Sequence, residues 1–140
     1  MAKHPIRKFQ RLTTGDDAFR AKFRSWDMTE LSYVDIREYL KEKDTVLVPM
    51  ASTEQHGPHL PLYTDTITAI EVAQRVSEAI GVFHTPPIWT GYSPQHMHLP
   101  GEGRGTITIK ASTLNALMYD VARSLIHHGF NRIIFINGHG

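Results

Sequence analysis

The residues best suited to chemistry in this sequence are a carboxylate and an imidazole that lie two positions apart. Glu54 and His56 follow an apolar run, and in extended chain their side chains project to the same side while Gln55 points away. Asp65 comes after a segment, 57–61, that contains glycine and proline and can turn the chain back. We therefore expect all three candidate ligands to face one point, with Asp65 at the start of the next helix.

This set of side chains favours a divalent metal ion bound by nitrogen and oxygen. Zinc, manganese and iron(II) accept histidine and carboxylate ligands, and a carboxylate can bridge two ions about 3.5–4 Å apart. The chain has no cysteines, so a metal site must use these ligand types. His139 follows a second apolar run, and Gly138 and Gly140 beside it allow a tight turn that would aim it inward as a fourth ligand.

Each of these residues also has an ordinary structural explanation. Asp65 could be only a helix N-cap, Glu54 a solvated loop charge, and His56 or His59 a hydrogen-bonded structural histidine. The metal hypothesis depends on their combination at the ends of two apolar strands, and not on any one of them.

Apolar periodicity predicts an alternation of amphipathic helices and buried strands. A serine-to-aspartate capping pattern opens the first helix, and glycines close the later ones. The expected helices cover 32–43, a stripe from 69 to 80, and 112–129. The expected strands cover 45–48, 82–89, 106–109 and 132–136, with 82–89 at an edge because Pro86 and Pro87 interrupt it.

The alternation indicates an α/β fold with a mainly parallel sheet and helices on both faces. Ligands in such sheets bind at the carboxyl ends of the strands, where both polar clusters of this sequence fall. At 140 residues the chain has the size of one domain. We interpret residues 1–30 as an N-terminal arm over the surface or against another subunit.

Two motifs resemble the signatures of the creatininase family. The first is MASTEQHGPHLP at 50–61 followed by Asp65, and the second is NGHG at 137–140. The resemblance runs from about Leu31 to Gly140, so that 31–140 would be the N-terminal part of a creatininase-like domain. It implies a three-layer α/β fold, a homo-oligomer that is a hexamer, and two divalent metals that activate a water to hydrolyse a C–N bond. Zinc is favoured for the metals, with manganese or iron as alternatives.

The resemblance also implies roles for individual residues. Glu54 and His139 would bind one metal, His56 the other, and Asp65 would bridge the two. His59 would only support the site, for example by orienting a ligand.

Two further segments are expected to contribute to the substrate pocket. Segment 92–101 resembles the family's stretch beside the active site, and His96 matches it, either for substrate contact or proton transfer or as a structural histidine. At 102–105 the chain departs from the family pattern. This glycine-rich, charged insertion is either a surface loop or a mobile flap in which Glu102 or Arg104 contacts a polar substrate.

The expected function is that of a metal-dependent amidohydrolase acting on an amide or cyclic amide in a small polar molecule. The family also performs formamide hydrolysis, peptide trimming and keto-inositol ring opening, and a different class of function is a non-catalytic, metal-stabilised binding subunit. The formal net charge of +1 indicates no nucleic-acid or membrane partner. The sequence has neither a signal peptide nor a membrane-length apolar segment, which predicts a cytoplasmic protein. A second polypeptide or a missing C-terminal portion is expected to supply the remaining ligands.

Overall fold

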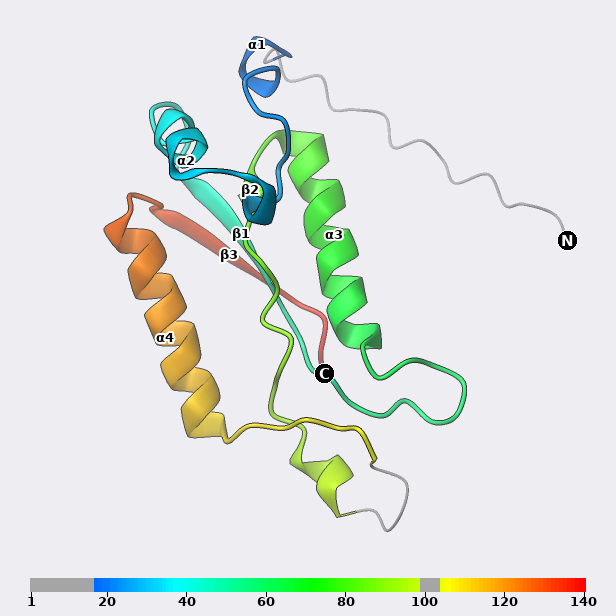
Figure 1. The fold of residues 1–140 in the computed structure, drawn as a ribbon. Coiled ribbons are helices and arrows are strands. Elements are labelled where there is room, and N and C mark those ends of the chain that lie inside the picture. The colour runs from blue at the N-terminus through cyan, green and yellow to red at the C-terminus, as the bar shows by residue number, and fades with distance from the viewer. Residues whose placement is uncertain (1–16, 99–103) are drawn as a thin grey trace, which may run out of the picture.

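A small parallel sheet lies between two long helices (Figure 1). The computed structural model describes residues 17–98 and 104–140. Its strands are β1 (Thr45–Met50), β2 (Phe83–His84) and β3 (Arg132–Asn137), and its α-helices are α1 (Asp17–Arg20), α2 (Tyr33–Tyr39), α3 (Thr64–Ile80) and α4 (Ala111–His127). Two short 3₁₀ helices, η1 (Met28–Glu30) and η2 (Pro94–Met97), lie in the connections.

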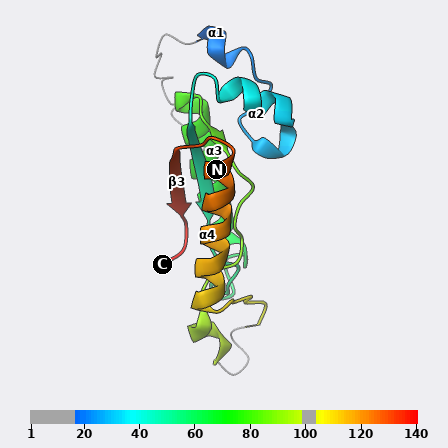
Figure 2. The same ribbon diagram turned by 90° about the vertical axis from the view of Figure 1, so that its left-hand side faces the viewer.

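The sheet has the order β2–β1–β3, and both strand pairs are parallel. Val46 of β1 pairs with Phe83 on one side and with Ile133 on the other. Helices α3 and α4 flank the strands in Figure 1, and the view in Figure 2 places α4 in front of the strands and α3 behind them. The expected α/β fold, with a parallel sheet and helices on both faces, is confirmed.

The helices begin and end near their sequence signals. At the start of α2, the Asp35 carboxylate accepts the Ser32 N–H (2.8 Å) and Ser32 Oγ accepts the Asp35 N–H (3.4 Å), which is a capping box. The Ser32 hydroxyl also lowers the pKa of Asp35 below its usual value. Helix α3 stops at Gly81, whose φ of 66° is left-handed. No helix of the described ranges is long and apolar enough to cross a membrane.

Two predicted strands differ from what the structure contains. The segment 82–89 forms only the short edge strand β2, after which single hydrogen bonds continue along β1, such as Ile88 N–H to the Pro49 oxygen (2.9 Å). The predicted strand at 106–109 is wrong. Its residues form only isolated bridges. Ile107 N–H donates to the Thr53 oxygen (2.9 Å), and Ile109 N–H donates to the Gly91 oxygen (3.0 Å). This segment therefore ties two loops together.

The core centres on the middle of β1 and a group of aromatic rings. Val46 is fully buried, and Tyr39 stacks on Phe83 with ring centroids 4.2 Å apart. The Tyr39 hydroxyl donates to the main-chain oxygen of Thr45 (2.7 Å). Burial raises the pKa of Tyr39 above its usual value, so the hydroxyl stays protonated and keeps this hydrogen bond. Tyr39 is buried at the end of α2, so this helix ends at residue 39 and not at residue 43 as predicted.

Residues 17–30, part of the segment interpreted as an arm, pack against this core. Phe19 is buried and contacts Tyr39 with ring centroids 5.9 Å apart. The Arg20 guanidinium donates to main-chain oxygens in the last turn of α3, including that of Ala79 (2.6 Å), where a cation opposes the negative end of the helix dipole. Residues 1–16 lie outside the described part of the chain.

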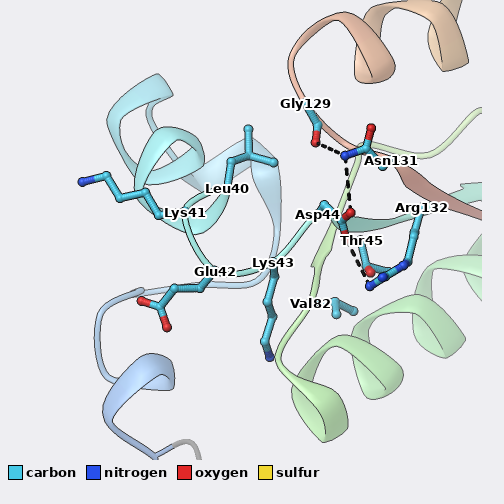
Figure 3. Close-up of a pocket in the computed structure, with 10 residues that line it drawn as sticks. All are labelled: Leu40, Lys41, Glu42, Lys43, Asp44, Thr45, Val82, Gly129, Asn131 and Arg132. Atoms are coloured by element: carbon cyan, nitrogen blue, oxygen red, sulfur yellow. Dashed lines mark hydrogen bonds and ion pairs between the residues drawn. The ribbon is translucent and has the colours of Figure 1, made fainter.

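A cleft of about 630 Å³ lies at the end of the sheet where β1 and β3 begin (Figure 3). Its charged side chains are engaged with neighbouring side chains or with the main chain. Asp44 lies 3.2 Å from the Arg132 guanidinium and accepts from Asn131 Nδ2 (3.4 Å), while Lys43 Nζ donates to the Gly81 oxygen (3.0 Å). None of the predicted site residues lines this cleft, so it is separate from the expected chemistry.

Candidate metal centre

The predicted metal ligands come from three elements that meet at the carboxyl edge of the sheet. Glu54 and His56 lie on the loop after β1, Asp65 lies in the first turn of α3, and His139 follows β3. In Figure 1 the C-terminus, just beyond His139, lies beside the loop between β1 and α3. This is the edge at which parallel α/β sheets bind ligands.

Asp65 lies at the middle of the cluster and contacts both imidazoles. Its Oδ1 is 2.9 Å from His56 Nε2, and its Oδ2 is 3.0 Å from His139 Nδ1. Glu54 Oε1 is 3.4 Å from the same nitrogen of His139. One ligand atom each from Glu54, His56 and Asp65 lies within 4.8 Å of the others. The structure thus brings all four predicted ligands together.

The outer nitrogen of each imidazole contacts a group that fixes its proton. His56 Nδ1 is 3.0 Å from the main-chain oxygen of Glu54, and His139 Nε2 is 3.3 Å from that of Tyr92. A carbonyl oxygen can only accept, so these nitrogens carry the hydrogens. In a neutral ring, the nitrogen facing Asp65 then presents a lone pair to a carboxylate oxygen, which also carries only lone pairs. A cation shared between them, or a second proton on each ring, relieves this conflict.

Glu54 provides a further test of whether a cation fits this site. Its side chain is almost completely buried, and among the described residues its Oε2 has no hydrogen-bond partner. His96 Nε2 lies 3.6 Å from this oxygen, which is too long for a hydrogen bond. A buried carboxylate oxygen without a partner costs free energy unless a cation neutralises it. The residues present therefore fit a bound divalent metal.

Gly138 matters because the backbone passes close to α3 at this point. A Cβ added to Gly138 would lie 2.4 Å from the main-chain oxygen of Asp65, whereas one added to Gly140 would meet no atom of the described residues within 4 Å. Among the described residues, positive φ occurs at other glycines, such as Gly57 and Gly81. The expected tight turn at Gly138 and Gly140 therefore does not use left-handed backbone. Position 138 requires glycine because a side chain there would collide with the main chain of α3.

His96 lies beside the cluster, and its role in a substrate pocket stays a prediction. It faces Glu54 through Nε2, and its Nδ1 is 2.8 Å from the Gln55 side-chain nitrogen. The sequence predicted that Gln55 points away, but its side chain instead contacts His96. Ser93 was also missed: its hydroxyl is fully buried, 3.2 Å from His139 Nε2 and 2.7 Å from Ser52 Oγ. No spacing in the sequence relates these residues, because they come from separate loops.

The remaining predicted site residues lie farther out. His59 is exposed and packs over the turn at Gly57, and no hydrogen bond within the described ranges joins it to the four ligands. Arg104 is exposed in a turn. Glu102 lies outside the described residues. The supporting role of His59 and the substrate roles of Glu102 and Arg104 stay predictions.

Comparison with known proteins gives the class of this chain. A model of the creatininase family, described as creatinine amidohydrolase, matches residues 29–140. Two relatives are the 3-dehydro-scyllo-inosose hydrolase of Thermotoga maritima, 36% identical over 75% of this chain and 33% of its own length, and the mycofactocin precursor peptide peptidase of Mycolicibacterium smegmatis, 44% identical over 68% and 39%. The creatinine amidohydrolase of Pseudomonas putida is 32% identical over 79% of this chain and 43% of its own length.

Solved structures agree with these relatives. A crystal structure of creatinine amidohydrolase matches with a TM-score of 0.76 and 31% identity, over 84% of this chain and 46% of that one. A mutant creatininase described as of the Zn-Zn type, with a TM-score of 0.76, and one described as creatininase Mn, with a TM-score of 0.75, are each 30% identical to this chain. They match over 84% and 83% of this chain respectively, and each over 46% of its own length. This chain belongs to the creatininase family. It spans between 33% and 46% of the length of these relatives.

Proposed function

We propose that this chain carries part of the active site of a metal-dependent hydrolase that cleaves a C–N bond, in an amide or cyclic amide, of a small polar molecule. One observation supports this most strongly. The two oxygens of Asp65 face the inner nitrogens of His56 and His139, and each ring is held from behind by a main-chain oxygen. Histidines that bind metals usually donate their other N–H to such a partner.

The proposed site holds two divalent ions. Glu54, His139 and Asp65 would hold one, and His56 and Asp65 the other, so that Asp65 bridges them. Zinc is favoured because imidazole nitrogen and carboxylate oxygen are both ordinary zinc ligands, with manganese or iron(II) as alternatives. The relatives described as Zn-Zn type and as creatininase Mn support this choice. When bound, such ions lower the pKa of a coordinated water and polarise a substrate carbonyl.

The chain's own residues would orient this chemistry. Ser93 and the main-chain oxygen of Tyr92 hold the His139 ring in place, and Asp65 fixes both imidazoles relative to one another. His96 lies on the Glu54 side of the cluster, where it can contact the substrate or move a proton. The relatives act on an inosose, a peptide precursor and creatinine, so we propose the bond class and leave the individual substrate open.

The proposed enzyme needs more polypeptide than this chain. Strand β3 is apolar, yet Ile134 at its centre is 49% exposed, and the relatives are more than twice as long. We propose that further polypeptide covers β3 and supplies the remaining ligands in a hexameric, cytoplasmic enzyme. Native mass spectrometry of the material from cells tests this. A species built of this chain alone would exclude the further polypeptide, and a monomer would exclude the hexamer.

The test of function uses the intact protein before and after chelation. We expect chelation to abolish hydrolysis of a panel of small amides that includes creatinine and formamides, and Zn²⁺ or Mn²⁺ to restore it, because the proposed ions would activate the attacking water. His139→Asn should lose metal and activity. His98→Asn is the matched control, because His98 is exposed.

Two results would contradict this proposal. Protein without metal that gains no activity from added Zn²⁺ or Mn²⁺ would exclude a metal-dependent hydrolase. Protein that binds metal but hydrolyses none of the amides would favour a metal-stabilised binding subunit instead.

A further inference from the structure

Gln55 lies between two proposed ligands, and its side chain makes two defined contacts. Its Oε1 accepts the Gly57 N–H at 2.9 Å, and its Nε2 lies 2.8 Å from His96 Nδ1. Its own main-chain N–H donates to Thr106 Oγ1 at 3.1 Å, which fixes the backbone from which the side chain extends. Gly57 has a φ of 71°, and this turn folds its N–H back toward the Gln55 amide.

These contacts determine which nitrogen of His96 carries the proton. A backbone N–H can only donate, so the end of the Gln55 amide that faces Gly57 must be the oxygen. The other end is then the NH₂ group, which is also only a donor. His96 Nδ1 must accept from it, and in a neutral imidazole the hydrogen therefore resides on Nε2.

The protonated Nε2 of His96 faces Glu54 of the metal cluster and makes no hydrogen bond to it. His96 Nε2 is 3.6 Å from Glu54 Oε2, which is too long for a hydrogen bond. The His96 side chain is 18% exposed, so the ring is held in a partly enclosed position. The N–H is thus available to an acceptor oxygen that enters beside Glu54.

We propose that Gln55 is a positioning residue that locks His96 as the Nε2–H tautomer, so that His96 acts as a neutral hydrogen-bond donor to a substrate carbonyl oxygen and not as a base. The identity of the acceptor rests on the proposed function, whereas the tautomer rests only on the contacts of Gln55. A neutral imidazole can polarise a carbonyl by donating in this way. Of the two roles proposed for His96, substrate contact is thereby favoured over proton abstraction.

The tautomer can be read directly by proton–nitrogen correlation NMR on the intact protein with isotope-labelled histidine. The His96 signals are assigned by their loss in His96→Phe. In the wild type we expect a hydrogen on Nε2 and none on Nδ1. Gln55→Glu should move a hydrogen onto Nδ1, because a carboxylate accepts where the amide donated, and Gln55→Met should leave a mixture of tautomers. Gln95→Glu is the matched control, since Gln95 is exposed beside His96, and it should leave the wild-type pattern unchanged.

Metal content and kinetics of the same variants complete the test. We expect Gln55→Glu to keep its bound metal while kcat on the amide substrate falls by about 100-fold, the usual loss for one donor to a developing oxyanion. A hydrogen on Nδ1 of wild-type His96, or an unchanged pattern in both Gln55 variants, would overturn the proposal. The expected NMR pattern in a protein that hydrolyses no amide would contradict the proposed function and still support the tautomer assignment.

Discussion

Asp65→Asn is expected to remove the bound metal ions from the protein and to abolish hydrolysis. Asp65 is the residue that contacts both imidazoles of the cluster, through a different oxygen in each case. Asparagine keeps the size of the side chain but has one oxygen and no charge, so it cannot hold two cations. Losing an outer-shell partner alone weakens metal binding by about 10–100-fold, and we expect the loss of a bridging ligand to exceed this. Competition with a chromophoric chelator measures the affinity.

Asp120→Asn provides the matched control for this prediction. Asp120 is an exposed carboxylate on α4, 3.7 Å from Arg123, and its replacement makes the same chemical change away from the cluster. The N-cap explanation of Asp65 is wrong, because Tyr63 is the N-cap of α3. The remaining structural explanation is a first-turn acid that only stabilises α3 through the helix dipole. In that case Asp65→Asn would lower the free energy of unfolding by about 1 kcal/mol or less and leave metal affinity at the wild-type value. This result would remove Asp65 from the proposed site.

Gly138→Ala is expected to damage both the stability of the protein and the metal site. The added Cβ would lie 2.4 Å from the main-chain oxygen of Asp65 and 3.2 Å from Ala69 Cβ, so the end of β3 must move away from α3. This movement separates His139 from Asp65. Overpacking of this kind costs about 1–3 kcal/mol, which urea unfolding can measure, and elemental analysis should show loss of metal.

Gly140→Ala makes the same substitution two residues later, where no atom of residues 17–98 and 104–140 lies within 4 Å of the added carbon. It should retain wild-type stability and metal content. Equal behaviour of Gly138→Ala and Gly140→Ala would mean that the contact between β3 and α3 does not position His139.

The sequence was most informative where one local rule decides the structure. The capping box of Ser32 and Asp35 and the left-handed stop at Gly81 follow from the chemistry of single residues, and both are present. The convergence of Glu54, His56, Asp65 and His139 was also predictable. It follows from the rule that parallel strands end at the same edge of a sheet.

The sequence was less informative where a residue's partner is distant along the chain. The alternation at 106–109 is typical of a strand, but alternation cannot show whether a neighbouring strand exists, and here the segment joins two loops. Gln55 was expected to point away because its neighbours were treated as extended chain, whereas its contact with His96 depends on the path of another loop. Phe19 is buried against Tyr39, although no periodic pattern in the sequence marks it as a core residue.

The central claim is that cations lie between the two imidazoles and the Asp65 carboxylate. Anomalous X-ray diffraction at the zinc edge, from crystals of the intact protein grown with Zn²⁺, tests it most directly. We predict two peaks about 3.5–4 Å apart, one beside Glu54 and His139 and the other beside His56, with Asp65 between them. Crystals that contain zinc elsewhere but show no anomalous peak within bonding distance of Asp65 would contradict this account.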